Sequence, residues 1–132
     1  MADPFVLADT PLHLAHGRLV PQPRFTGEMD WYMAYDGRHG ADGPTGMLVT
    51  QHRFTADWDS WEMHPEGDEM VMCLDGAITL HQELVDGTRA TVTLTAGQFA
   101  INPPGCWHTA DVATSATCLF ITCGTGTEGR PR

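Results

Sequence analysis

Four side chains in two short segments have the types and spacing of metal ligands. Glu62 and His64 are two residues apart, so on a β-strand both point to the same face. Glu69 follows a Pro-Glu-Gly-Asp turn and opens the next strand, from which its carboxylate can return to the same pocket. His108 follows the rigid Asn-Pro-Pro-Gly turn at 102–105 and starts another strand. Two imidazoles with one or two carboxylates suit a divalent transition ion (Fe, Zn, Mn or Ni) better than Ca or Mg.

The two glutamates have several possible roles at such a site. Glu62 is a ligand, a general acid or base beside the ion, or a side chain with only a local hydrogen bond. Glu69 is a ligand or a group that moves a proton. If both carboxylates bind, they neutralise a divalent ion, and the site then prefers a neutral or weakly anionic substrate. The alternative for His64 and His108 is that they are buried histidines of a metal-free binding pocket.

Short stretches rich in strand-forming residues must position these side chains. Asp86-Gly87 separates two alternating stretches and is a strong hairpin signal. No segment shows sustained helical periodicity. About seven or eight strands at regular spacing predict an all-β sandwich or barrel. The clearest stretches are 47–54, 70–74, 77–85, 90–96, 98–102 and 116–122.

The remaining segments are rich in proline and glycine. Four prolines interrupt residues 1–30 and exclude a long helix, so we expect an arm with one or two short strands. Residues 37–46 are expected to form a loop because of their Gly and Pro content. The Gly- and Thr-rich end, 124–132, is expected to be a mobile tail.

Size and charge narrow the classes of function. The 132 residues suit one domain, and 42% hydrophobic and 18% charged residues are an ordinary globular balance. The net charge of −10 disfavours nucleic acids and anionic membranes as partners. No apolar run approaches the ~18 residues of a membrane span. Residues 1–20 lack the pattern of a secretory signal, so we expect a cytoplasmic protein.

The four cysteines give no motif of their own. No two of them form a C-x-x-C pair, so the sequence contains neither a zinc knuckle nor a thioredoxin motif. Cys73, Cys118 and Cys123 lie in apolar stretches and are expected in the core as free thiols. Cys106 lies in the Pro/Gly turn beside His108 and is expected to have no chemical role.

Two segments resemble the motifs of the cupin superfamily. The stretch EMHPEGDEMVMCLDG (62–76) matches the family pattern of His, one residue, His, three or four residues, Glu, six residues and Gly, except at its first position. The stretch GQFAINPPGCWH (97–108) matches Gly, five residues, Pro, one residue, Gly, two residues and His. The resemblance covers roughly residues 45–123. It departs from the pattern at Glu62, where the first histidine is usual, and at Val112, where asparagine is frequent. Some cupins, among them those like phosphomannose isomerase, have a side-chain oxygen at the first position and still bind a metal.

The resemblance implies a fold and a set of functions. It implies a single-domain cupin in which residues 31–123 form a double-stranded β-helix, or jelly-roll barrel. The metal would lie inside the barrel, held by Glu62, His64, Glu69 and His108, with Glu62 or Glu69 as catalytic groups. The implied function is a small-molecule enzyme of the dioxygenase or isomerase/lyase/cyclase type, and the alternative is a non-catalytic small-molecule-binding cupin. Cupins commonly form homodimers through N-terminal strands, a role that the arm at 1–30 could serve.

Overall fold

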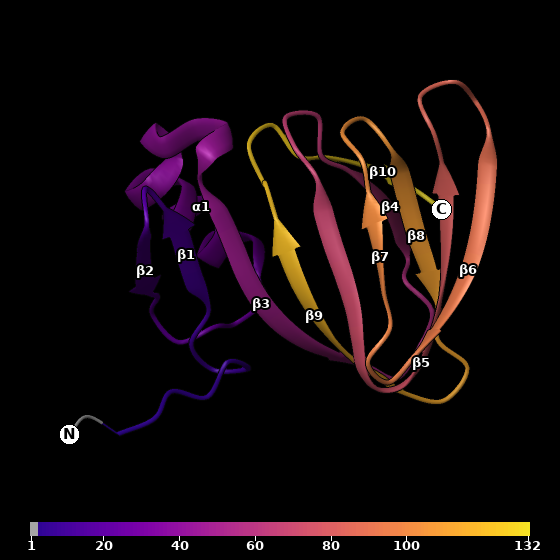
Figure 1. Cartoon of the computed structure of the whole chain (residues 1–132), viewed down its shortest axis with the longest axis horizontal. Helices are drawn as coiled ribbons and strands as arrows, with labels where there is room; N and C mark the ends of the chain where they lie inside the picture. Colours follow the sequence, from indigo (N-terminus) through magenta and orange to yellow (C-terminus); the bar gives the residue numbers. More distant parts are fainter. Residues whose placement is uncertain (1–2) are drawn as a thin grey trace.

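Ten strands, one α-helix and one 3-10 helix make up the part of the chain that the computed structural model describes, residues 3–132 (Figure 1). No helix in this part is long and apolar enough to cross a membrane. In chain order the elements are β1 (Leu12–Ala15), β2 (Arg18–Pro21), α1 (Met29–His39), the 3-10 helix η1 (Gly40–Thr45), β3 (Met47–Phe54), β4 (Ser60–Met63), β5 (Glu69–Glu83), β6 (Arg89–Thr95), β7 (Phe99–Asn102), β8 (Trp107–Asp111), β9 (Ala116–Thr122) and β10 (Glu128–Pro131).

The long strand β5 joins the two halves of the barrel. Its first half pairs with β7 and β9, and its second half pairs with β6 and β8, always antiparallel. The register shifts between Cys73 and Asp75, and Gly76 follows with a φ of 79°. A Cβ at Gly76 would lie 2.1 Å from the backbone oxygen of Ser115, so only glycine fits this bend.

The bend in β5 lets side chains of both halves share one core. One half continues from β5 through β9 and β3 to the hairpin β1–β2, and the other continues through β8 and β4 to β10. The sequence predicts an all-β jelly-roll barrel, and this arrangement confirms it. The core consists of Val71, Cys73, Ile78, Leu80, Leu94, Ala110, Val112, Ala116, Cys118 and Phe120.

Most predicted strands are present at the predicted positions. The stretches 47–54 and 116–122 are β3 and β9, and 90–96 and 98–102 correspond to β6 and β7. The stretches 70–74 and 77–85 are the two halves of β5 rather than separate strands. The expected arm contains the hairpin β1–β2, which pairs with β3 of its own chain.

The helix α1 was not expected from the sequence, and the predicted loop at 37–46 is partly wrong. The helix runs to His39, and the 3-10 helix η1 follows it. Of the α1 side chains only Trp31 is buried, so the helix has no apolar stripe that a periodicity search would find. Trp31 packs edge-on against Phe25, and the ring of Tyr35 stacks against it. These tertiary contacts hold the helix at the end of the barrel near the hairpin (Figure 1).

The end of the chain differs from the expected mobile tail. Residues Glu128–Pro131 form β10, which pairs antiparallel with β4 over the register Met63 to Ser60. Arg130 donates a hydrogen bond to Glu83 at 2.8 Å, and its guanidinium lies 4.4 Å from the ring centre of Trp107. Arg132 donates to the backbone oxygens of Trp58 and Ala110, at 2.9 Å each. Contacts with residues distant in sequence fix this strand, and the composition of 124–132 does not reveal them.

Candidate metal centre

Neighbouring strands and a turn bring the two histidines together. His64 directly follows β4, and His108 lies in β8, where its register partner across the strand pair is Glu62. The backbone oxygen of His64 accepts a hydrogen bond from the Gly105 N–H at 3.0 Å. Gly105 ends the Pro-Pro-Gly turn with a φ of 78°, a conformation that glycine adopts without strain. The turn before His108 is thus fixed against the segment that carries His64.

Glu69 lies between the two imidazoles. Its Oε2 is 3.1 Å from His64 Nε2, and its Oε1 is 3.1 Å from His108 Nε2. All three residues are buried, with 3%, 5% and 0% of their surfaces exposed for Glu69, His64 and His108. Although these contacts are close, their directions do not form hydrogen bonds, and both Nε2 atoms lack a hydrogen-bond partner within residues 3–132. Buried polar atoms without partners are costly and indicate a group that would satisfy them.

Hydrogen bonds on the far side of each ring fix the proton positions. His108 Nδ1 lies 3.2 Å from the backbone oxygen of Cys106, which only accepts, so Nδ1 carries a proton and donates it. His64 Nδ1 lies 2.8 Å from Thr127 Oγ1, whose own proton is donated to the Gly124 oxygen at 2.8 Å. Thr127 therefore accepts from His64 Nδ1. In the neutral rings both Nε2 atoms are therefore unprotonated, and they face Glu69. Metal-binding histidines have the same arrangement, in which one ring nitrogen donates its proton to a neighbour and the other binds the ion.

Polar neighbours hold the Glu69 carboxylate in place. Asn102 Nδ2 donates to Oε1 at 3.2 Å, and Thr122 Oγ1 donates to Oε2 at 2.7 Å. Burial alone raises the pKa of Glu69, but the close contacts with His108 and His64 outweigh it and bring the pKa below its ordinary value. Burial lowers the pKa of His108, and Glu69 more than offsets this, so the net shift of that pKa is upward. The centre therefore favours a positive charge between these groups.

Glu62 lies at the solvent-facing side of the centre. Ligand atoms of Glu62, His64 and His108 all lie within 4.8 Å of one another. Part of Glu62 remains exposed to solvent. Desolvation of its carboxyl raises the pKa of Glu62, and the negative charge of Glu69 raises it further. The structure thus brings all four predicted side chains together, with Glu69 buried between the histidines and Glu62 partly exposed beside them.

Aromatic side chains line the inside of the barrel next to the candidate metal centre. His52 of β3 is in contact with the rings of Phe54 and Phe120, so it is His52 rather than Gln51 that faces inward. Tyr32 of α1 lies with its hydroxyl 3.4 Å from His52 Nε2. Burial raises the pKa of Tyr32, and the charges of Glu62 and Glu69 raise it further. Helix α1 therefore contributes to the surroundings of the candidate site.

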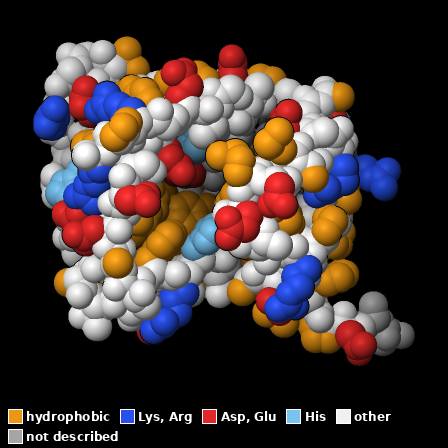
Figure 2. All heavy atoms as spheres, turned by 180° about the vertical axis from the view of Figure 1, so that it is seen from behind, with side chains coloured by type: hydrophobic (Ala, Val, Ile, Leu, Met, Phe, Trp, Pro, Cys, Tyr) orange, Lys and Arg blue, Asp and Glu red, His pale blue; other side chains and the backbone are white. Residues whose placement is uncertain are grey.

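Trp58 adds an apolar surface with one polar atom. Its ring lies 6.3 Å from that of His108 and 5.4 Å from that of Phe54, measured between ring centres. Its Nε1 is buried and has no hydrogen-bond partner within residues 3–132. Figure 2 shows a hollow on one face of the molecule, with hydrophobic side chains at its bottom and histidine and acidic side chains beside it. Side chains of the same kinds, aromatic residues, histidines and glutamates, surround the candidate metal centre.

A protein-family model for the cupin domain matches residues 53–123, a segment that contains the four candidate ligands. The chain belongs to the cupin family. A search among curated proteins found no match.

Solved structures share the cupin fold with this chain. Peruvianin-I, a cysteine peptidase from Thevetia peruviana latex, has a TM-score of 0.53 and 22% identity over 65% of this chain and 55% of its own. An oxalate oxidase has a TM-score of 0.54 and 16% identity over 61% and 44% of the two chains. The hydroquinone 1,2-dioxygenase PnpCD, solved with Cd²⁺ and 4-hydroxybenzonitrile, has a TM-score of 0.50 and 18% identity over 58% and 56%. The cupin thus spans about half the length of these chains, and the likeness is one of fold.

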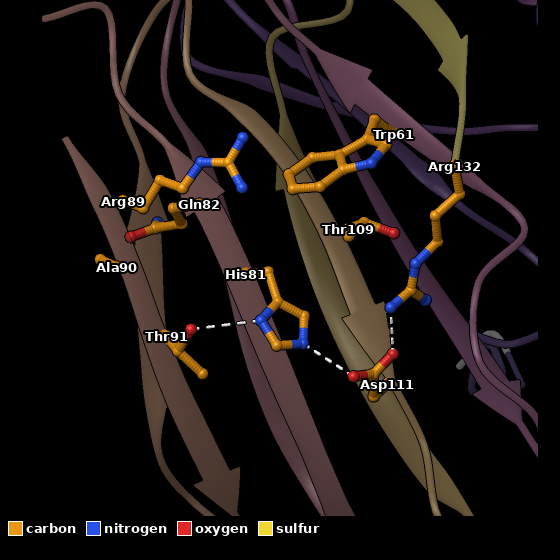
Figure 3. A pocket seen from close by; sticks show the side chains of 9 residues that line it. All are labelled: Trp61, His81, Gln82, Arg89, Ala90, Thr91, Thr109, Asp111 and Arg132. Carbon is orange, nitrogen blue, oxygen red and sulfur yellow. Dashed lines mark hydrogen bonds and ion pairs between the residues drawn. The ribbon is translucent and has the colours of Figure 1, made fainter. Parts of the chain in front are cut away.

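Other polar residues of the cupin lie on its outer surface. A pocket of about 330 Å³ lies on the strands β5, β6 and β8. Figure 3 shows His81 in it, between Thr91 and Asp111. His81 Nε2 is 2.7 Å from Asp111 Oδ2, and Arg132 pairs with the other oxygen. Trp61 lines this pocket and faces away from the metal centre, as strand alternation predicts.

Three residues that support the centre were not identified from the sequence. Asn102 begins the Asn-Pro-Pro-Gly turn, and its position beside that turn is the one local signal for it. Thr122 is the last residue of β9, and Thr127 lies in the segment that we expected to be mobile. Threonine is frequent in strands and turns, so no local pattern marks either of them. Cys106, whose side chain is buried, donates only to a backbone oxygen.

Proposed function

We propose that this cupin is a metal-dependent enzyme that acts on a small organic molecule inside the barrel, as an Fe(II)-dependent dioxygenase. The observation that carries the proposal is the pair of buried histidine Nε2 atoms without hydrogen-bond partners, each 3.1 Å from the Glu69 carboxylate. Two histidines and one carboxylate are the ligand set of non-haem Fe(II) oxygenases. When bound, the ion would supply open coordination positions for substrate and dioxygen.

The chain's own residues define what the substrate would meet. Phe54, Trp58 and Phe120 offer an apolar aromatic wall beside the histidines. The unpaired Nε1–H of Trp58 can donate one hydrogen bond to a substrate oxygen. These features support a small, mainly apolar substrate with at least one oxygen atom. Proteins of similar fold include an oxalate oxidase and a hydroquinone dioxygenase, so phenols and small carboxylic acids form the first test panel.

A second candidate reaction is proton transfer in an isomerase, lyase or cyclase. It is favoured by Glu62, whose partly exposed carboxyl has a raised pKa next to the proposed ligands. A carboxyl with a pKa closer to neutrality is a better general acid and base. In this reaction Glu62 would move the proton while the ion polarises a carbonyl or an enol oxygen.

Metal content is the first test. Protein purified without an affinity tag is analysed by elemental mass spectrometry, together with His64→Ala, His108→Ala and the matched control His81→Ala on the outer surface. We expect about one equivalent of a transition metal in the barrel, lost in the first two variants and kept in the third. Parallel loss in Glu62→Gln would make Glu62 a ligand. Retention of the metal with loss of turnover would make it an acid or base.

The type of reaction follows from a second measurement. Oxygen consumption with the phenol and carboxylic acid panel is expected from the Fe(II)-loaded protein and not from His108→Ala. Product formation without oxygen consumption, sensitive to Glu62→Gln, would instead support proton transfer. If the wild type binds no Fe, Zn, Mn or Ni when these are supplied, the alternative of a non-catalytic small-molecule-binding cupin replaces the enzyme.

We further propose that the cupin is a cytoplasmic homodimer. None of the four cysteines belongs to a C-x-x-C pair, which suits free thiols in a reducing compartment. The net charge of −10 supports a protein without nucleic-acid or anionic-membrane partners. The dimer is supported by an apolar outer face that includes Phe99 and Ile101, with 55% and 44% of their surfaces exposed.

A further inference from the structure

Gln82 is a polar side chain on the inward face of β5, at the end of an otherwise apolar row. Ile78 and Leu80 precede it at alternate positions, and both are buried in the core. The amide Nε2 of Gln82 donates a hydrogen bond to the backbone oxygen of Ile101 at 2.9 Å and another to Asn102 Oδ1 at 2.7 Å. Gln82 thus directs both of its N–H donors at the end of strand β7.

These two bonds fix the directions of two amide groups in turn. A backbone oxygen only accepts, so the nitrogen of the Gln82 amide, and not its oxygen, has to face Ile101. The same nitrogen meets the side chain of Asn102, which therefore has to accept through Oδ1. The nitrogen of Asn102 is thereby directed to Glu69, where Nδ2 donates to Oε1 at 3.2 Å. One backbone oxygen thus determines, through two amides, which atom of Asn102 the Glu69 carboxylate meets.

Burial makes the direction of the Asn102 amide important for Glu69. Both side chains are buried, with 2% and 3% of their surfaces exposed. Thr122 donates to the other carboxylate oxygen at 2.7 Å, so each oxygen of Glu69 accepts one hydrogen bond and the carboxylate is held between His64 and His108. If the Asn102 amide turned over, its Oδ1 would face Glu69 Oε1, and two buried acceptors would lie in contact without a proton between them.

We propose that Gln82 is a positioning residue of the barrel centre, which holds the Asn102 amide in the direction that keeps the Glu69 carboxylate between the two histidines. The consequence for metal affinity rests on the proposed function, whereas the direction of the amides does not depend on an ion. Partners of a metal ligand that lie outside the coordination sphere usually contribute a factor of about 10 to 100 to metal affinity. Gln82 reaches Glu69 through one further side chain, so we expect its contribution at the lower end of that range.

Two variants separate the direction of the amide from simple packing. Gln82→Glu keeps the shape of the side chain but loses both N–H donors, so Asn102 is expected to turn its nitrogen toward position 82. Gln82→Met keeps the length without forcing Asn102 to turn. We expect a Co²⁺ affinity about 10-fold weaker in Gln82→Glu and a smaller loss in Gln82→Met. An added negative charge alone would attract the cation and tighten binding. Wild-type or tighter affinity in Gln82→Glu, or equal losses in the two variants, would overturn the proposal.

A matched control and a double variant test the route through Asn102. Gln51 lies on β3 beside the inward-facing His52, so Gln51→Glu adds the same charge on the outer side and should bind Co²⁺ like the wild type. In an Asn102→Ala background, Gln82→Glu should cause no further loss of affinity, because the amide that it would turn is gone. A loss as large as in the wild-type background would mean that Gln82 acts by another route, and would overturn the proposal.

A measurement on the metal-free protein keeps this proposal separate from the proposed function. The side-chain N–H₂ signals of Asn102 are assigned by NMR through their loss in Asn102→Ala. Their nuclear Overhauser contacts with the Cγ protons of position 82 should be weak in the wild type, where the nitrogen faces Glu69, and strong in Gln82→Glu. Equal contacts in both proteins would overturn the positioning role. If the wild type binds no Co²⁺, the metal-dependent function fails, and this comparison still decides the role of Gln82.

Discussion

The direction of two nitrogen lone pairs distinguishes the barrel centre from an ordinary pair of buried histidines. The Cys106 backbone oxygen orients His108, and no side-chain substitution removes that acceptor. The hydroxyl of Thr127 orients His64 from a separate strand connection. The two histidines therefore differ in how easily their orientation can be disturbed. A side-chain substitution can therefore remove the hydrogen-bond acceptor of His64, but not that of His108.

We expect Thr127→Val to weaken metal binding in the barrel by about 10- to 100-fold, because His64 loses the partner of its Nδ1–H. Valine keeps the shape of threonine without the hydroxyl. Competition with a coloured chelator measures the affinity, and circular dichroism checks that the fold persists. Thr125→Val, in the same connection, is the control and should bind like the wild type. Equal affinity of the two variants would mean that Thr127 does not orient the ligand.

The residues of the barrel centre were partly predictable. Glu62, His64, Glu69 and His108 could be grouped because strand alternation and short turns determine their relative directions. Thr127 could not, because it is 63 residues from His64 in the sequence and the strand that follows it, β10, forms only against β4. Glu62 has a place in the centre that spacing predicts, whereas its pKa depends on burial and on Glu69, which spacing does not reveal.

At the scale of elements, prediction succeeded where a pattern is local and failed where tertiary contacts decide. The strands β3 and β9 carry β-forming residues throughout, and they formed where expected. Helix α1 buries only Trp31 and therefore lacks an apolar stripe. Strand β10 is held by arginines that reach Glu83, Asp111 and backbone oxygens of other strands. The Gly-rich composition of residues 124–132 is equally compatible with a mobile tail and with a strand. Only the contacts with other parts of the fold decide between them.

The attachment of β10 should depend on pH through Asp111. The ion pair with Arg132 and then the bond with His81 lower the pKa of Asp111. Stability from a lowered carboxyl pKa is present above the unfolded value, about 3.9, and is lost as pH falls through the folded pKa. We expect Asp111→Asn to reduce the free energy of unfolding at pH 7 by about 1 kcal/mol or less, because the pair is partly exposed.

Urea titrations at several pH values check this expectation. The difference between the wild type and Asp111→Asn should shrink below about pH 4. Asp75→Asn removes the same charge from a residue without an ion pair in residues 3–132 and serves as the control. A difference that stays constant down to pH 2 would show that Asp111 acts by packing rather than by charge.

The bend in β5 should tolerate no side chain at Gly76. Gly76 and Gly87 both have positive φ, at 79° and 85°, so an alanine is strained at either position. A Cβ at Gly76 would also lie 2.1 Å from the Ser115 oxygen, while nothing lies within 4 Å of one at Gly87. We expect Gly87→Ala to cost about 1–2 kcal/mol in the free energy of unfolding and Gly76→Ala at least about 2 kcal/mol more. Chemical denaturation of both variants measures it, and equal losses would contradict the clash.

At the scale of the whole molecule, an acidic chain presents one apolar outer face. The chain carries a net charge of −10. Yet the outer face of β5, β7 and β9 presents a row of apolar side chains in register, with Met70 opposite Ile101 and Met72 opposite Phe99. The same two methionines face Ile121 and Leu119 on the other side. Continuous apolar faces of this kind are typical of protein–protein interfaces. A second copy of the chain presents an identical face and can cover it.

The double variant Phe99→Lys/Ile101→Lys should therefore convert the proposed dimer into a monomer. Both side chains are exposed within one chain, so the change is tolerated by the monomer, whereas a dimer would have to bury uncompensated charges. We expect the dimer dissociation constant to rise by at least about 30-fold. Light scattering after size exclusion measures the mass.

Val85→Lys is the control. Val85 is a hairpin residue with 79% of its surface exposed, so the variant adds one charge away from this face and should stay dimeric. A wild type that is monomeric at micromolar concentration would refute the dimer. A double variant that remains dimeric would refute this face as its interface and direct attention to the free edge of β2.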